Sequence, residues 1–244
     1  MRRLATLFAG ICAVVSQASA ASDVTAGESV VVLHGLARSS DSMSRMTRAL
    51  EEGGYHVCNV SYPSRQHSIE ALAKDFVLPA VKACRPSETD KIHFVTHSLG
   101  GIVVRQLAKS APDIRIGRVV MLSPPNHGSE VVDKLGDLTL FQLINGPAGL
   151  ELGTGEKSVP LSLGPASFEV GIITGRRTIN LILSMLIPGS DDGKVSIESA
   201  KLEGMADFRV IPSSHPFIMN NRLAIEQTLA FLAIGKFSPE AEQP

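Results

Sequence analysis

The sequence predicts an α/β protein built on a mostly parallel, doubly wound sheet with helices on both faces. Short runs of β-branched and other apolar residues alternate with longer amphipathic stretches along most of the chain. These short runs are apolar throughout rather than at every second residue, which is typical of strands buried on both faces. The chain has 244 residues, 44% of them hydrophobic, and this is enough material for one full core.

The first half of the chain contains four predicted strands separated by three predicted helices. The strands are expected at residues 29–35, 56–63, 91–95 and 116–125. The helices are expected at residues 41–55, 68–84 and 101–111. Because each helix connects two strands, we expect neighbouring strands to run parallel.

The regular alternation stops after Pro124. Residues 129–165 are rich in Gly, Leu and Pro and predict a long irregular insert, and such inserts are usually functional or disordered. The many leucines argue against disorder, so we expect residues 124–167 to form a cap or a pocket wall. Two more strands, at 168–174 and 207–211, and a helix around 221–234 complete the prediction.

The start of the chain, residues 1–20, has the composition of a signal peptide. Two arginines precede an apolar run, and a small-x-small motif ends at Ala20. A membrane anchor is the alternative, but the run is shorter than the ~20 residues that cross a bilayer. We therefore expect one mature domain, residues 21–244, that is exported to the periplasm or secreted.

Cleavage after Ala20 would leave two cysteines, Cys58 and Cys84. In an exported chain this pair suggests one disulfide, although two buried thiols that never meet remain the alternative. The net charge is −1 and the chain has no tryptophan. This balance gives no basic surface or stacking platform, so we expect no nucleic-acid partner.

The strand at residues 91–95 is followed by a serine and then by two glycines. In a doubly wound sheet, sites form at the carboxyl ends of the strands, where Ser98 is expected. On a sharp strand-to-helix turn, its hydroxyl would project into such a site. The small residue at Gly100 would let the strand and the helix approach closely.

This segment resembles the nucleophile motif G-x-S-x-G of the α/β-hydrolase family. The chain reads Thr96-His97-Ser98-Leu99-Gly100, with Thr96 in place of the first glycine. The longer run FVTHSLGGIVVR is similar to bacterial lipases and lipase-like esterases, including the group related to the GPI inositol-deacylases. The likeness continues through VVLHGL, PPNHGSE and DDGKV and covers nearly the whole mature chain.

The resemblance implies a catalytic triad in the chain order serine, acid, histidine. Ser98 would be the nucleophile, and His215, which follows the predicted strand at 207–211, would be the base. The family's acid directly precedes a glycine, which indicates Asp192, with Asp191 as the second choice. An Asp-Asp-Gly sequence is also an ordinary turn, so a purely structural role remains open for both.

The family's oxyanion hole is made of two backbone N–H groups. Here they would belong to Leu99, after the nucleophile, and to Leu36, in the loop after the first strand. The resemblance also suggests that His34, Pro125, Asn126 and His127 contribute to the substrate pocket. For residues 124–130 a rigid Pro-Gly turn is an equally good interpretation.

The favoured hypothesis is a serine hydrolase that cleaves carboxylic esters through an acyl-enzyme, without a metal or another cofactor. The substrate would be an ester or a lipid-like small molecule, with transient contact to a membrane or lipid surface. An acyltransferase or amidase could use the same triad. A non-catalytic exported protein that binds ligands or assists folding is the third hypothesis, and Thr96 is its best support. The sequence fixes neither the acyl chain length nor the oligomeric state.

Overall fold

Six strands form one sheet in which every neighbouring pair is parallel. The structure, a computed structural model, describes residues 27–85, 87, 90–178, 187 and 189–239. The strand order is β2-β1-β3-β4-β5-β6. The strands are β1 (Ser29–Leu33), β2 (His56–Val60), β3 (Ile92–His97), β4 (Ile116–Leu122), β5 (Val170–Gly175) and β6 (Asp207–Ile211). This confirms the predicted fold class. The predicted signal peptide, residues 1–20, lies outside the described residues.

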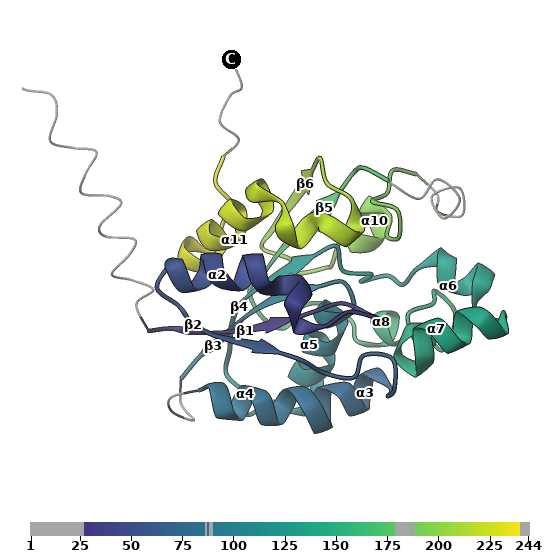
Figure 1. The fold of residues 1–244 in the computed structure, drawn as a ribbon, viewed down its shortest axis with the longest axis horizontal. Helices are drawn as coiled ribbons and strands as arrows, with labels where there is room; N and C mark the ends of the chain where they lie inside the picture. Colours follow the sequence, from purple (N-terminus) through teal and green to yellow (C-terminus); the bar gives the residue numbers. More distant parts are fainter. Residues whose placement is uncertain (1–26, 86, 88–89, 179–186, 188, 240–244) are drawn as a thin grey trace, which may run out of the picture.

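Helices cover both faces of the sheet (Figure 1). One face carries α2 (Ser44–Glu52), which continues the short helix η1 (Ser40–Met43), and α11 (Arg222–Ile234). The other face carries α3 (Ile69–Ala71), the π-helical turn η2 (Leu72–Val77), α4 (Leu78–Cys84) and α5 (Leu99–Ser110). Each face therefore has its own apolar layer, which explains why the strands lack a regular alternation of apolar and polar residues.

Strand β1 shows how one strand serves both layers. Val31 and Leu33 belong to the cluster beneath α3, α4 and α5, whereas Val30 and Val32 belong to the cluster beneath α2 and α11. All four side chains are fully buried. Successive side chains of a strand point to opposite faces, so a sequence without polar alternation fits a sheet covered twice.

The strand order reverses at β1. The chain passes from β1 outward to β2 and then returns to β3 on the opposite side of β1. The connections after β1 and β3 therefore lead to helices on opposite faces of the sheet. Such a switch point opens a crevice at the carboxyl ends of the strands, where ligands bind in open α/β sheets.

The insert after β4 is helical, which corrects the expectation of an irregular segment. It contains α6 (Glu130–Leu135), α7 (Thr139–Leu150) and α8 (Val159–Ser162), and α6 and α7 lie beyond one end of the sheet (Figure 1). The glycines and prolines that obscured this pattern break α7 internally. Gly146 has a φ of 63° and precedes Pro147. A Cβ at Gly146 would overlap the carbonyl oxygen of Arg65, so only glycine fits this bend.

Two short helices, α10 (Ile197–Ala200) and η3 (His215–Asn220), flank β6 in the chain. The expected disulfide is present and joins Cys58 on β2 to Cys84 at the end of α4. Among the described residues, no helix has both the length and the apolar character to cross a membrane.

Candidate active site

Ser98 lies at the turn between β3 and α5. Its φ of 52° and ψ of −120° form a conformation that residues other than glycine rarely adopt. Its N–H donates to Leu122 O on β4 at 2.9 Å, and its own carbonyl accepts from Gly101 N–H. A Cβ at Gly100 would lie 2.9 Å from Leu33 O, so α5 can approach β1 this closely only with glycine there. The close approach holds the sharp turn on which Ser98 sits.

His215 is the first residue of η3, directly after the loop that follows β6. Its Nε2 lies 3.0 Å from Ser98 Oγ, and its ring is buried. The His215 N–H donates to the carbonyl oxygen of Asp192 at 2.9 Å. The backbone and the ring of His215 are therefore both fixed relative to the segment that carries Asp192.

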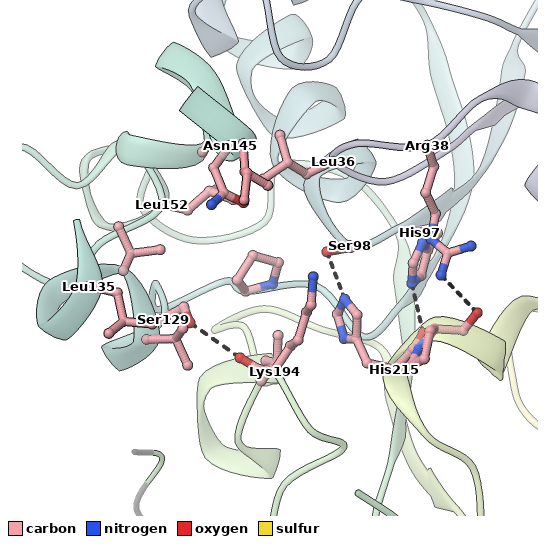
Figure 2. A pocket seen from close by; sticks show the side chains of 17 residues that line it. Leu36, Arg38, His97, Ser98, Ser129, Leu135, Asn145, Leu152, Lys194 and His215 are labelled. Atoms are coloured by element: carbon pink, nitrogen blue, oxygen red, sulfur yellow. Dashed lines mark hydrogen bonds between the residues drawn. The ribbon is translucent and has the colours of Figure 1, made fainter. Parts of the chain in front are cut away.

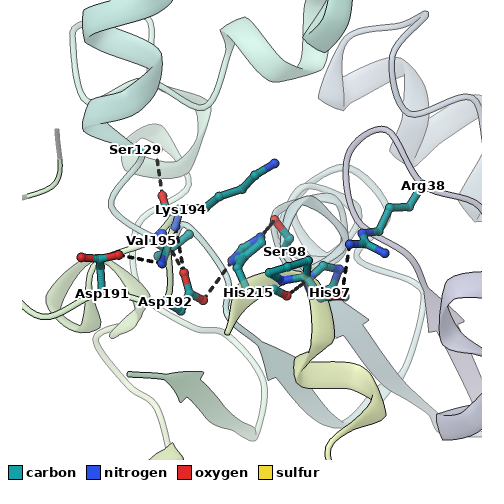
Figure 3. Close-up of polar contacts among 11 residues, drawn as sticks. Arg38, His97, Ser98, Ser129, Asp191, Asp192, Lys194, Val195 and His215 are labelled. Carbon is teal, nitrogen blue, oxygen red and sulfur yellow. Dashed lines mark hydrogen bonds and ion pairs between the residues drawn. The ribbon is translucent and has the colours of Figure 1, made fainter. Parts of the chain in front are cut away.

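Asp192 lies against the other side of the His215 ring (Figure 3). The distance from His215 Nδ1 to Asp192 Oδ2 is 2.9 Å. The second carboxylate oxygen accepts the N–H groups of Lys194 at 3.1 Å and Val195 at 2.9 Å. A carboxylate can only accept hydrogen bonds, so His215 carries its proton on Nδ1 and turns its free Nε2 lone pair toward Ser98.

Burial alone would raise the pKa of Asp192, whose side chain is inaccessible to solvent. The charge and the hydrogen bond of His215, together with the Val195 N–H, outweigh this effect and hold the pKa of Asp192 below its usual value. Asp192 is consequently ionised at neutral pH, as an acceptor for an imidazolium must be.

Asp191, the second choice for the acid, points away from His215 (Figure 3). Its Oδ1 accepts the N–H of Gly193 at 2.6 Å, and its backbone pairs with Ser196 in an isolated bridge. These contacts close the loop from Gly189 to Ser196 on itself. The structure thus brings Ser98, His215 and Asp192 into one hydrogen-bonded row and leaves Asp191 outside it.

Two other histidines support this row without joining it. His97 is buried, and its Nε2 donates to the carbonyl oxygen of His215 at 3.0 Å. Desolvation, together with the charges of His215 and Arg38, lowers the pKa of His97 well below its usual value. His97 therefore stays neutral and holds the backbone of His215 in place.

His34 holds the loop after β1 rather than lining the pocket, which corrects its expected position. Its Nδ1 donates to Gly35 O at 2.9 Å, and its Nε2 accepts the Tyr62 N–H at 3.3 Å. The two rings stack with centroids 4.2 Å apart, and Tyr62 Oη donates to His34 O. Burial lowers the pKa of His34. This neutral ring fixes the loop that presents Leu36.

Leu36 and Leu99 flank Ser98. Leu99 is the first residue of α5, and the N–H groups of a helix's first turn have no partner within the helix. Leu36 lines the same cavity as Ser98 (Figure 2). Of the two residues expected to supply an oxyanion hole, Leu36 therefore lies at the cavity and Leu99 directly follows Ser98 in the chain.

A cavity of about 290 Å³ opens over Ser98 and His215. Residues of the insert form its apolar wall: Val131, Val132, Leu135, Ile144, Gly149 and Leu152. Pro125 also lines the cavity. Asn126 and His127 do not, because Asn126 is buried among backbone groups and donates to Ala200 O at 2.9 Å, and the His127 side chain is exposed.

The described residues contain one group that could hold a metal ion by proximity alone, His56 with Cys58 and Cys84. The two sulfur atoms are bonded to each other and are therefore not thiolate ligands.

Comparison with known proteins identifies the family to which the chain belongs. The family model of the α/β hydrolase fold matches residues 28–151, which is just over half of the chain. The chain belongs to the α/β-hydrolase family. No curated protein matches it.

Solved structures show the same fold at low identity. The mature form of the Bacillus licheniformis lipase BlEst2 is 18% identical, with a TM-score of 0.68 over 86% of this chain and 93% of the lipase. The metagenomic carboxyl esterase MGS0156 is 21% identical, with a TM-score of 0.64 over 80% of this chain and 66% of the esterase. Aspergillus fumigatus lipase B is 14% identical, with a TM-score of 0.66 over 87% of this chain. The match covers 54% of the length of Aspergillus fumigatus lipase B, so this chain spans about half of that protein.

Two cations at the cavity of this α/β-hydrolase were not anticipated from the sequence. Arg38 and Lys194 both line the cavity beside Ser98 and His215 (Figure 2). Each lies two residues after a motif position, Arg38 after Leu36 and Lys194 after Asp192. This spacing could have indicated both residues, because a residue that closely follows a motif residue on a tight loop lies near the site.

Sequence reasoning also missed Arg105, which lies outside the cavity and anchors the insert. It lies on α5, is almost fully buried, and donates to the carbonyl oxygens of Asn126, Pro160 and Gly164 at 2.7–3.2 Å. Burial lowers the pKa of Arg105 to about 10. A single charge within the apolar helix sequence GIVVRQLA was a signal of a buried polar contact.

Proposed function

We propose that this α/β-hydrolase cleaves carboxylic esters through an acyl-enzyme on Ser98. The observation that carries the proposal is the row of contacts from Ser98 Oγ to His215 Nε2 at 3.0 Å and from His215 Nδ1 to Asp192 Oδ2 at 2.9 Å. A serine hydroxyl is a weak nucleophile until a base takes its proton, and the third group orients that base. A structural role alone would not require this order of donors and acceptors.

In the acylation step, Ser98 Oγ attacks the ester carbonyl while its proton moves to His215 Nε2. The imidazolium that forms is stabilised by the ionised Asp192. The carbonyl oxygen becomes negative and accepts the N–H groups of Leu36 and Leu99, whose loss would typically cost about 2.7–4 kcal/mol each in transition-state stabilisation. The tetrahedral intermediate then expels the alcohol, which takes the proton from His215 Nε2.

In the deacylation step, water enters on the side that the alcohol has left. His215 Nε2 takes a proton from the water, and the resulting hydroxide attacks the acyl carbonyl. Collapse of the second intermediate releases the carboxylic acid and returns the proton to Ser98 Oγ. The sequence of steps consumes one ester and one water and restores the enzyme without a cofactor.

The apolar wall formed by the insert favours acyl groups with a hydrocarbon chain. Leu143 and Ile144 on α7 are largely exposed, and Ile144 also lines the cavity. Apolar side chains that surround a cavity mouth favour contact with a lipid surface. The disulfide fits an oxidising compartment and supports export.

The test is activity and active-site labelling of wild type and Ser98→Ala. We expect wild type to hydrolyse p-nitrophenyl esters and to be labelled by a fluorophosphonate, and Ser98→Ala to lose labelling and about 10⁵–10⁶-fold in kcat. The matched control is Ser110→Ala, an exposed serine at the end of the same helix, which should behave as wild type.

Full activity of a folded Ser98→Ala variant would overturn the proposal. A folded wild-type protein that neither labels nor hydrolyses any ester would favour the non-catalytic alternative. Formation of a new ester when an acceptor alcohol is added would identify an acyltransferase.

A further inference from the structure

Two positive side chains face the cavity of the proposed hydrolase, and its lining contains no Asp or Glu. Arg38 comes from the loop after β1, and Lys194 comes from the loop that carries Asp192. Among the described residues, neither Arg38 nor Lys194 takes part in an ion pair with a carboxylate. An anionic group of a bound ligand would therefore meet two cations that have no carboxylate ion-pair partner among the described residues.

Arg38 is held in place by its neighbours. Its Nη2 donates to Pro216 O at 3.1 Å, and Pro216 directly follows His215. This bond uses one of the five N–H donors of the guanidinium. The side chain is half-buried, and desolvation lowers the pKa of Arg38. The guanidinium is thus a fixed, partly dehydrated donor next to the proposed base.

Lys194 has a fixed backbone and an extended side chain. Its N–H donates to Asp192 Oδ1 at 3.1 Å, and its carbonyl accepts from Ser129 Oγ at 3.2 Å. Two close-up views show the side chain running beside His215 toward Ser98 (Figures 2 and 3). The side chain is open to solvent at the cavity, yet protein atoms surround much of it, and desolvation together with the charge of Arg38 lowers the pKa of Lys194.

Asp192 attracts Lys194 and acts to raise the Lys194 pKa, but burial and the charge of Arg38 outweigh this effect. The Asp192 carboxylate is already used by His215 and by the N–H groups of Lys194 and Val195. Two like charges that are partly desolvated repel each other, and an anion placed between them removes that cost and gains charge-assisted hydrogen bonds.

The cavity has two chemically different ends. Leu135 and Leu152 lie at one end and Arg38 lies at the other, with Ser98, His215 and the end of the Lys194 side chain between them (Figure 2). The proposed base must deliver its proton to the leaving alcohol, so the alcohol lies on the His215 side of Ser98. Arg38, which is bonded to the residue after His215, is therefore on the alcohol's side, and the acyl chain faces the apolar end.

We propose that the natural substrate is an ester whose alcohol part carries a phosphate or carboxylate group, and that Arg38 and Lys194 bind this group while the acyl chain lies against the insert. This inference rests on the proposed ester hydrolysis and adds the charge and the position of the substrate's polar group. A planar guanidinium with an adjacent ammonium suits oxygen anions, because both donate charge-assisted hydrogen bonds.

The experiment compares kcat/KM for esters of one acyl chain below their aggregation concentrations. The neutral ester is 1-octanoylglycerol, the phosphate ester is 1-octanoylglycerol 3-phosphate, and the carboxylate ester is 3-(octanoyloxy)propanoate. We expect wild type to prefer at least one anionic ester over the neutral one by about tenfold or more, and the preference to fall as salt is added. The two anionic arms show whether phosphate or carboxylate is the better ligand.

A second comparison tests where the charge is bound. p-Nitrophenyl octanoate and the p-nitrophenyl monoester of octanedioic acid differ by a carboxylate on the acyl chain. We expect the charged acyl chain to be disfavoured, because it would enter the apolar end.

Arg38→Gln and Lys194→Gln should each lower the preference for the anionic ester about tenfold. The matched controls are Arg45→Gln and Lys74→Gln, exposed cations outside the cavity, which should keep the wild-type preference.

A wild-type preference near one, or a preference that both cavity variants retain, would overturn the inference while leaving ester hydrolysis intact. A wild-type protein that hydrolyses none of these esters and is not labelled by a fluorophosphonate would overturn the proposed function and the inference together.

Discussion

Ser98 has an unfavourable backbone conformation that its neighbours maintain. A residue with a Cβ costs about 1–3 kcal/mol in such a region of φ and ψ and remains there only when the surroundings enforce it. Here the bond to Leu122 O and the close packing of Gly100 against Leu33 O enforce it. This backbone conformation directs the Ser98 hydroxyl toward His215 rather than into the core.

Asp192→Asn tests the residue that orients His215. An asparagine keeps the shape but removes the charge, and its amide can hold the imidazole in the wrong tautomer. We expect kcat for a p-nitrophenyl ester to fall about 10⁴-fold, with little change in the circular dichroism spectrum.

The matched variant is Asp191→Asn, because the Asp191 carboxylate accepts the Gly193 N–H and lies outside the row of contacts that includes His215. It should retain activity within about tenfold. A larger loss in Asp191→Asn than in Asp192→Asn would show that the acid has been assigned to the wrong aspartate.

The sequence was informative for residues whose chain order matters. Ser98 followed from its position after a strand, and His215 followed from the chain order of the family that the sequence resembles. The structure places the two side chains in contact. The choice between Asp191 and Asp192 depended on how one tight loop turns, and adjacent residues in a loop have no periodicity that decides it. Arg38 and Lys194 were missed because a lone cation on a loop is usually a solvated side chain.

At the scale of elements, Arg105 connects the helix after Ser98 to the insert. Its guanidinium binds backbone carbonyl groups near both ends of the insert, at Asn126 and at Pro160 and Gly164. These oxygens would be left without donors if the side chain were removed, and each buried unsatisfied polar group costs about 1–3 kcal/mol.

Arg105→Met should therefore destabilise the protein by about 2–4 kcal/mol and expose residues 130–165 to limited proteolysis. The control is Lys109→Met, one turn further along α5, where an exposed ammonium lies 3.4 Å from Ser162 O. Thermal unfolding should show a small change in the control. Equal stability of the two variants would mean that Arg105 does not hold the insert.

The six strands were predictable because each contains a short group of β-branched or other apolar residues and is bounded by turn residues. Helix α7 of the insert was not predictable, because Gly146 and Pro147 lie inside it and such residues normally end a helix. Contacts across the fold, such as the one between Gly146 and Arg65, allow the helix to continue past the break. Local pattern carries no information about contacts of this kind.

At the scale of the whole molecule, three of the histidines that the fold buries have lowered pKa values. His34 and His97 lie near the candidate site, and His93 lies on β3. Desolvation is the largest cause that lowers the pKa of each of them. The unfolded chain protonates these rings near pH 6.5, whereas the folded protein does so only at lower pH.

The free energy of unfolding should therefore be highest above about pH 6.5 and fall as the pH falls toward the lowered pKa values. The unfolded state binds more protons in this window, so each histidine contributes a slope of up to about 1.4 kcal/mol per pH unit. Urea unfolding at pH 7.5, 6.5 and 5.5 measures it.

His93→Gln should reduce this slope, and His127→Gln, which changes an exposed histidine, should leave it unchanged. A free energy of unfolding that stays constant between pH 7.5 and 5.5 would contradict neutral burial of the three rings.

The disulfide between Cys58 and Cys84 ties the edge strand β2 to helix α4. Strand β2 is outermost, so half of its backbone amide and carbonyl groups face no neighbouring strand. We expect the attachment to α4 to keep this edge strand from detaching and pairing with a second molecule. Dithiothreitol would release that tether, and we expect self-association through β-strand exchange to increase during storage or heating.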